Sequence, residues 1–314
     1  MAAATLLLAF TLSPNPAWSE DGPEFSQRLS PPFAYRYSGM QERQIEALDG
    51  QLQARLPELA RELGVQPPRH VSVVLLSADR EADFFGPAWA QVPSWLQGFA
   101  VPEQSLIVVR LRRLGTYPHR DAASVAEHEL VHLLLARGAA PYAQRLPRWF
   151  HEGVAMLLAR EWRFVDRWHL FSAVIRARFV PLAALERGFP QDDLGARISY
   201  AESFSFVRYL VRRHGAALPA RLLREVRSGA SFEEAFEKLT GARLAAAARN
   251  WQGEINLFYR WVPVVGSSIS LWGVLSVLVV IGYLRKRRKT RAILKRWEEE
   301  EGPHHPWDPG GSTH

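Results

Sequence analysis

The sequence contains no cysteine among its 314 residues. This absence excludes disulfide scaffolds, iron–sulfur clusters, thiolate metal sites and cysteine nucleophiles. A transition metal in this chain would therefore need histidine, aspartate or glutamate ligands. Lysine is scarce as well, so almost all of the positive charge is arginine; the four lysines are Lys238, Lys286, Lys289 and Lys295. Such a bias weakens any argument for nucleic-acid binding from arginine content, and we expect no nucleic-acid partner.

The net charge of +7 is unevenly placed along the chain. Residues 285–296 hold eight basic residues and no acidic one, and a run of acidic residues follows from Glu298. Apolar residues make up 47% of the chain and charged residues 23%, which is ordinary for a globular protein with a hydrophobic core. The composition therefore excludes a chain that is disordered throughout.

Two apolar runs lie near the ends of the chain. Residues 1–19 have the length of a signal peptide with small residues before Glu20, although no basic residue precedes the apolar part. A short apolar helix is the alternative. Residues 261–284 form a run of 24 residues without a charge, where about 20 suffice to cross a bilayer. A buried core helix is the alternative for this second run.

The basic residues that follow Leu284 predict the orientation of such a span. Positive charge marks the cytoplasmic end of a membrane helix. We therefore expect a single-pass protein of the bacterial cytoplasmic membrane, with residues 20–260 on the outer, periplasmic side. Residues 285–314 would then form a basic juxtamembrane segment and a disordered cytoplasmic tail.

The segment between these ends has an α+β pattern. Residues 20–40 are predicted to be extended, and residues 41–260 to form one domain. The β-branched runs at 71–76 and 106–109 predict two buried strands of a small N-terminal sheet. Helical spacing of apolar residues dominates the rest. The predicted helices are 41–63, 121–137, 149–160, 164–178, 200–213, 217–228, 231–239 and 242–259.

The motif that carries chemistry is His128-Glu129-Leu-Val-His132. Helical residues four apart project from one face, so both imidazoles can reach a single Zn²⁺ at about 2.0–2.1 Å. Glu129 follows the first histidine and can accept a proton from a water molecule at the open coordination position. Two unrelated surface histidines are the alternative.

A hydrolytic zinc site needs a third protein ligand. Glu152 lies 20 positions after His132, beyond Pro147, which marks a helix start. The second helix can fold back and present Glu152 to the histidine pair. His151 competes for this position, but adjacent helical residues point about 100° apart, so only one of the two can face the metal.

These residues resemble the gluzincin metallopeptidases, and the stretch Pro-Arg-Trp-Phe-His-Glu-Gly-Val-Ala at 147–155 is similar to the peptidase-MA-like domains of bacteria. The resemblance implies a zincin-like catalytic domain with one Zn²⁺ per chain. It also implies that His128, His132 and Glu152 bind the metal and that Glu129 is the general base.

The chain departs from thermolysin-like enzymes at Met156, where those enzymes place a carboxylate that orients a histidine. Asp121, Glu127, Glu161 and backbone carbonyls are candidates for that supporting role. Related domains carry a tyrosine at the position of Tyr200. Its phenol would steady an oxyanion, or its ring would only pack in the core.

If the strand at 106–109 lies at the sheet edge beside the metal helix, an extended peptide could pair with it. An irregular aromatic loop over 82–104 precedes it, and its Trp89, Trp95 and Phe99 either form substrate pockets or cover the core.

We interpret the chain as a membrane-anchored zinc metallopeptidase that hydrolyses a peptide or protein substrate. A non-catalytic, zinc-stabilised binding or adaptor module of the envelope is the alternative, but such a module would not need a general base at Glu129. A third reading gives residues 285–296 a contact with anionic lipids.

Overall fold

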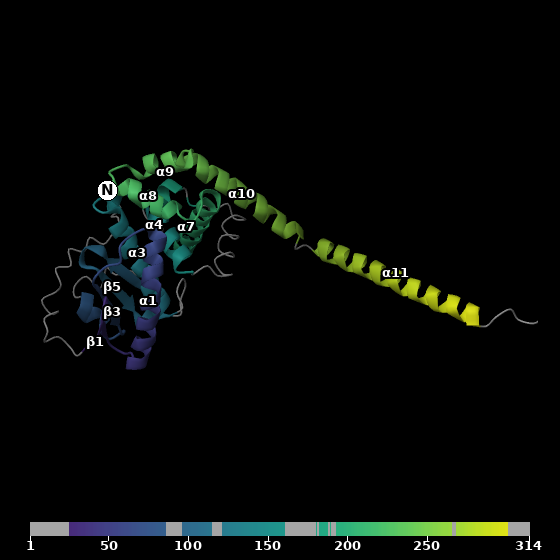
Figure 1. Ribbon diagram of the computed structural model, residues 1–314, viewed down its shortest axis with the longest axis horizontal. Helices are drawn as coiled ribbons and strands as arrows, with labels where there is room; N and C mark the ends of the chain where they lie inside the picture. Colours follow the sequence, from purple (N-terminus) through teal and green to yellow (C-terminus); the bar gives the residue numbers. More distant parts are fainter. Residues whose placement is uncertain are drawn as a thin grey trace, which may run out of the picture. The chain divides into compact units, whose positions relative to one another are not determined.

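The computed structural model describes residues 25–85, 96–114, 121–160, 180, 182–187, 189, 193–265 and 268–300. Contacts within the chain separate two compact units, Met1–Asn256 and Leu257–His314. The first unit contains the sheet, the helices that pack on it and the candidate site (Figure 1).

Strands and helices follow one another in the first half of the described chain, and helices dominate the second half. The strands are β1 (Ser26–Ser30), β2 (Phe33–Tyr37), β3 (Val71–Leu76), β4 (Gly98–Val101) and β5 (Leu106–Arg110). The helices before the midpoint are α1 (Glu42–Leu63), α2 (Glu81–Phe85), α3 (Ala122–Ala139) and α4 (Arg148–Leu158). The later helices are α6 (Leu182–Arg187), α7 (Asp193–His214), α8 (Leu218–Arg227), α9 (Phe232–Thr240), α10 (Leu244–Val265) and α11 (Ser268–Glu300). These elements confirm the predicted α+β pattern.

The five described strands form one sheet in the order β1-β2-β3-β5-β4. Strands β2, β3 and β5 are parallel, while β1 and β4 are antiparallel to their neighbours. The predicted strands at 71–76 and 106–109 are confirmed as β3 and β5. The condition that 106–109 lies at the sheet edge is not met, because β4 pairs with β5 and takes the edge position.

The alternation of side chains along the strands separates two hydrophobic clusters. Ile107 and Val109 of β5 face α1 and α3, which form the main core with the later helices. Val108 faces the other side, where it packs with Phe84 and Phe85 of α2. Phe99 of β4 joins this smaller cluster, so this aromatic residue covers a core.

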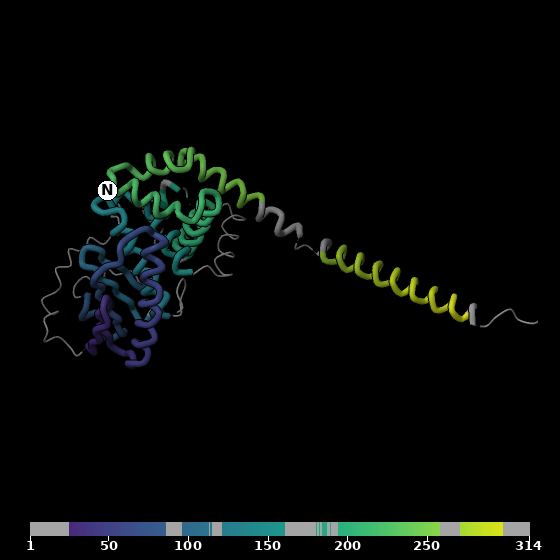
Figure 2. The backbone as a smooth tube through the Cα atoms, viewed as in Figure 1, coloured from purple at the N-terminus to yellow at the C-terminus, as the bar shows by residue number. Residues whose placement is uncertain are grey.

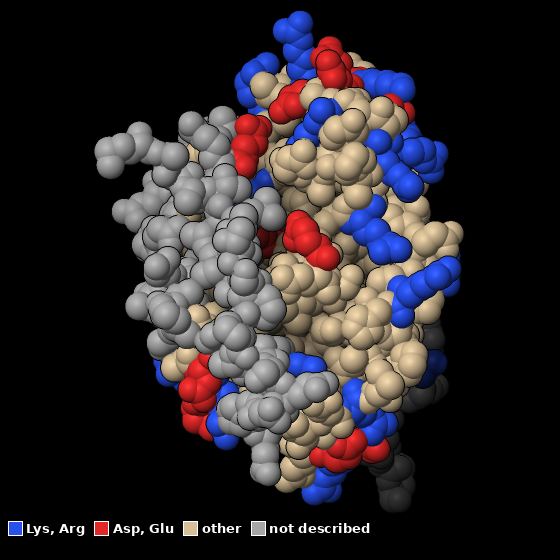
Figure 3. Space-filling view, turned by 90° about the vertical axis from the view of Figure 1, so that its left-hand side faces the viewer, with Lys and Arg blue, Asp and Glu red and all other residues tan. Residues whose placement is uncertain are grey.

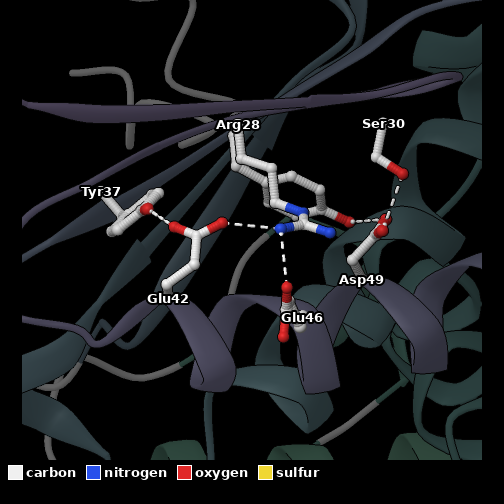
Figure 4. A network of polar contacts seen from close by, with 7 residues as sticks. Arg28, Ser30, Tyr37, Glu42, Glu46 and Asp49 are labelled. Atoms are coloured by element: carbon white, nitrogen blue, oxygen red, sulfur yellow. Dashed lines mark hydrogen bonds and ion pairs between the residues drawn. The ribbon is translucent and has the colours of Figure 1, made fainter.

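A polar network fastens the β1–β2 hairpin to α1 (Figure 4). Arg28 donates to Glu42 at 2.6 Å and to Glu46 at 3.2 Å. The hydroxyl of Ser30 donates to Asp49 at 2.7 Å, and Tyr35 donates to the other oxygen of that carboxylate at 2.9 Å. Residues 26–37, predicted to be merely extended, thus form a hairpin whose polar side chains meet carboxylates one helical turn apart.

The helix limits follow local capping chemistry. Helix α1 ends at Gly64, whose φ of 65° is the left-handed conformation that glycine adopts easily. Ser231 and Glu234 form a capping box at the start of α9. In the tube view, the hairpin lies at one end of the first unit and α8 and α9 lie at the other, while α1 runs from the hairpin toward α8 (Figure 2). The predicted helix 164–178 lies outside the described residues.

The structure does not support the predicted membrane span over 261–284. Within the residues that it describes, no helix is both long and apolar enough to cross a bilayer. The predicted signal peptide lies outside the described residues, and the cellular location stays a prediction.

Candidate metal centre

Helix α3 carries the two histidines. It begins after Asp121, whose carboxylate accepts from the backbone N–H of Ser124 at 2.8 Å and so caps the first turn. The helix is largely enclosed by the core, and His128 and Glu129 are both buried. His132 is partly exposed.

Helix α4 carries the third candidate ligand, the acidic residue Glu152. Pro147 stands immediately before the helix, as the sequence predicts, and Glu152 lies buried in its middle. The next residue is Gly153, where an added Cβ atom would lie 2.4 Å from the backbone oxygen of Ser203 in α7. Only glycine allows α7 to approach α4 this closely beside Glu152.

The side chains of His128, His132 and Glu152 converge on one point. The two Nε2 atoms are 3.1 Å apart, and Oε2 of Glu152 lies 3.4 Å and 3.5 Å from them. A tetrahedral metal with bonds of about 2.0–2.1 Å separates its ligand atoms by about 3.3–3.4 Å. The donor set and its spacing therefore fit a zinc ion held by two imidazoles and one carboxylate. It is the only such group of three among the described residues.

The electrostatics of the site keep Glu152 ionised. Burial alone raises the pKa of this carboxyl, but hydrogen bonds from His128 and His132 and the nearby Arg148 charge outweigh it. They hold the pKa of Glu152 well below its usual range. The result is an anionic oxygen directed at the two histidines, as a cation site requires.

His151 does not join the three ligand atoms. Its ring centre lies 5.7 Å from that of His132. Burial, with a smaller contribution from His132, lowers the pKa of His151 to about 3, so the imidazole is neutral at ordinary pH. The structure thus brings Glu152, and not His151, to the histidine pair.

Arg148 contacts the other oxygen of the ligand carboxylate, a role that the sequence analysis missed. Its Nε lies 3.5 Å from Oε1 of Glu152, four residues along the same helix. Its guanidinium also lies over the ring of Phe189 at 4.8 Å, and this ring meets Tyr200 edge to face at 5.0 Å. The i, i+4 spacing in α4 is a sequence signal that could have indicated the first contact.

The residues proposed for the supporting role have other partners. Asp121 caps α3. Glu127 accepts from Arg55 of α1 at 2.7 Å, and the same arginine donates to the backbone oxygen of Leu158 at 2.7 Å. Arg55 thereby joins the two helices that carry the ligands. Glu161 lies outside the described residues.

Strand β4 passes directly beside Glu129. A Cβ atom at Gly98 would lie 2.6 Å from Cγ1 of Val125 and 3.4 Å from Cγ of Glu129. Arg110 N donates to Gln97 O at 2.8 Å, which fixes the alternation of hydrogen bonds between β4 and β5. It follows that the N–H and C=O groups of Gly98 and Ala100 point away from β5. Among the described strands, β4 has β5 as its single neighbour, so this side of β4 is a sheet edge.

Figure 3 shows one face of the molecule with its described charged side chains coloured. Among the side chains described there, basic groups lie mostly along the top and one long side of this face, and acidic groups lie near its centre and toward its two ends. The loop residues Trp89 and Trp95, considered above as pocket residues, lie outside the described part of the chain.

Comparison with known proteins gives a family and a set of similar folds. The profile of the Peptidase MA superfamily matches residues 52–257. Among solved structures, the M1 zinc metallopeptidase of Deinococcus radiodurans is 15% identical, with a TM-score of 0.48 over 73% of this chain. A mutant of that enzyme bound to Tyr-Ser-Ala substrate is also 15% identical, with a TM-score of 0.48 over 74% of this chain.

The chain spans about half of those structures, covering 52% of each. A comparison with curated proteins finds no match. The profile match extends over more than half of the sequence and contains all three converging side chains. The chain therefore belongs to the Peptidase MA superfamily.

Proposed function

We propose that this protein is a zinc-dependent peptidase. The observation that carries the proposal is the convergence of one carboxylate and two imidazole nitrogens at 3.1–3.5 Å, with Glu129 buried beside them. Three protein ligands leave one position of a tetrahedral ion open, which is the arrangement of catalytic zinc sites. Structural sites use four protein ligands, so the geometry favours an enzyme over a zinc-stabilised binding module.

Zinc in such a site supplies Lewis acidity, which polarises a carbonyl and lowers the pKa of water. Side chains of this protein would carry out the proton transfers and stabilise the oxyanion. Glu129, adjacent to the first ligand, accepts the proton of the attacking water and returns it to the departing amine. Tyr200, linked to the site through Phe189 and Arg148, donates its phenol hydrogen to the developing oxyanion.

The substrate in this proposal is an extended peptide that pairs with β4. The backbone groups of Gly98 and Ala100 on the sheet edge can hydrogen-bond to a peptide in the manner of an added strand. Gly98 abuts the helix that carries Glu129. A peptide aligned along β4 would therefore present a backbone carbonyl close to the general base.

The test is to measure zinc and hydrolysis in the same preparation of the full chain. We expect about one zinc per chain and cleavage of a library of unstructured peptides. Removal of zinc by a chelator should abolish cleavage, and added zinc should restore it. A protein that carries zinc but cleaves no peptide in the library would contradict the proposal.

A pair of histidine variants provides the control. His132→Ala should lose both zinc and hydrolysis, because it removes one of three ligands. His70→Ala should keep both, since His70 is exposed and hydrogen-bonds only to Ser72 among the described residues. Equal loss in both variants would show that the zinc is not held by the predicted site.

A further inference from the structure

The sheet contains a fully buried ion pair outside the metal site. Arg110, the last residue of β5, and Glu81, the first residue of α2, are 1% and 0% exposed. Nη2 of Arg110 donates to Oε2 of Glu81 at 2.9 Å. Because side chains alternate along β5, Arg110 lies on the same side of the sheet as Val108 and α2, opposite to Val109, which faces the main core.

Such a pair is a weak source of stability. Burial removes both charges from water, and replacing a buried pair by apolar residues is often neutral or stabilising. The other carboxylate oxygen of Glu81 has no hydrogen-bond partner among the described residues, which adds to the desolvation cost. The role of the Glu81–Arg110 pair is therefore positional: it fixes the segment of the chain that it contacts.

The pair holds the chain just before β4. Nη1 of Arg110 donates to the backbone oxygen of Leu96 at 2.8 Å. The backbone N–H of the same arginine donates to the oxygen of Gln97 at 2.8 Å. One residue thus fixes two consecutive carbonyls immediately ahead of Gly98, and Glu81 fixes the direction of its guanidinium.

The position of these carbonyls controls the distance between β4 and the catalytic helix. Strand β4 and helix α3 are already in close contact after these carbonyls, because a Cβ atom added at Gly98 would lie 2.6 Å from Val125. A slip of one residue would also turn the groups of Gly98 and Ala100 toward β5. Both the pairing register of β4 and its distance from Glu129 therefore depend on Arg110.

We infer that Arg110, oriented by Glu81, is a positioning residue for peptide substrate. It holds β4 in the one register that aligns an added peptide strand with Glu129 and the ligand cluster. The inference rests on the proposed function in so far as β4 is the substrate strand. Its structural half, the control of β4 by the buried pair, can be tested without any activity.

The main test replaces both charges at once, since Arg110→Met alone would leave Glu81 buried without its counter-charge. The double variant Glu81→Leu/Arg110→Met in the full chain should fold and keep its zinc. Its KM for extended peptides should rise on the order of tenfold to a hundredfold. Binding of acetohydroxamate, a small ligand for the metal alone, should be unchanged. The double variant Glu225→Leu/Lys238→Met removes an ion pair between α8 and α9, formed by an exposed lysine and a partly buried glutamate, and should alter neither the KM nor acetohydroxamate binding.

Hydrogen exchange separates this inference from the proposed function. In the double variant, the amides of Phe99 and Val101 should lose protection while those of β3 keep it. Arg110→Lys, which keeps the charge but has no fork to reach both Glu81 and Leu96, should show an intermediate loss. Unchanged protection of β4, or an equal loss of peptide and acetohydroxamate binding, would overturn the inference. Absence of hydrolysis in the wild type would instead refute the proposed function.

Discussion

The guanidinium of Arg148 lies 3.5 Å from Oε1 of Glu152, while Oε2 of the same carboxylate faces the two histidines. One oxygen is thus held by an arginine, and the other is directed at the metal position. Groups that orient a metal ligand in this way commonly change metal affinity by about 10–100-fold when they are removed.

We therefore expect Arg148→Met to weaken zinc binding by about 10–100-fold while the protein stays folded. The measurement is competition with a chromophoric chelator at constant pH. Arg137→Met is the matched control, because Arg137 is exposed in the last turn of α3. Equal zinc affinity in the Arg148 variant and the wild type would show that the contact does not orient Glu152.

The distinction between the adjacent residues of α4 can be tested by zinc content. Glu152→Ala should lose the metal, because it removes the one anionic ligand atom. His151→Ala should retain it, since the neutral imidazole stays outside the ligand cluster. The measurement is the zinc content of the two purified variants by elemental analysis. Zinc retained by Glu152→Ala and lost by His151→Ala would show that His151 is the third ligand.

Gly98→Ala tests the close approach between β4 and α3. The new Cβ atom would meet Val125 at 2.6 Å and the backbone oxygen of Val108 at 2.8 Å, so the strand must move. We expect a loss of about 1–3 kcal/mol in unfolding free energy, measured by denaturant titration. Gly50→Ala is the control: nothing lies within 4 Å of its Cβ position in α1, and it should stabilise by about 0.5–1 kcal/mol. Equal stability of the Gly98 variant and the wild type would refute the close approach.

Glu202 makes the stability of the fold depend on pH. Burial raises the pKa of Glu202 to about 8, although the backbone N–H of Val180 donates to its carboxyl and works against the shift. The folded state therefore binds this proton more tightly than the unfolded state, whose value is near 4.5. The contribution of Glu202 to the unfolding free energy is therefore fully present below about pH 4.5 and is lost as the pH rises through 8.

Glu202→Gln should flatten this dependence, because the amide is neutral at every pH and can still accept from Val180. Unfolding free energies measured from pH 5 to 8 should fall less steeply in the variant than in the wild type. At about 1.4 kcal/mol per pKa unit, the difference should reach a few kcal/mol at pH 8. Glu62→Gln on the exposed end of α1 should leave the slope unchanged. Parallel curves of unfolding free energy against pH for the wild type and Glu202→Gln would refute the raised pKa of Glu202.

Local patterns predicted the elements and residues that depend on local chemistry. The apolar spacing of α1, the runs that form β3 and β5, and the i, i+4 histidines of α3 all appear in the structure. Glu152 could be predicted because Pro147 marks the start of its helix. Each of these signals lies within one segment of the chain.

What the sequence did not indicate depends on contacts between distant segments. Strand β4 is four residues long and begins with glycine, so its identity comes from pairing with β5 and not from strand propensity. The polar strand β1 owes its place to carboxylates on α1. Neither the buried pair of Glu81 and Arg110 nor the contact of Arg55 with two ligand helices has a local pattern.

The central claim is that Glu129 is the general base of a zinc peptidase, and its most direct test is Glu129→Gln in the full chain. Glutamine preserves size but cannot accept the proton, so the variant should keep about one zinc per chain and lose on the order of 10²–10⁴ in hydrolysis rate. Glu62→Gln should match the wild type in both. Undiminished hydrolysis by a zinc-loaded Glu129→Gln protein would contradict the account.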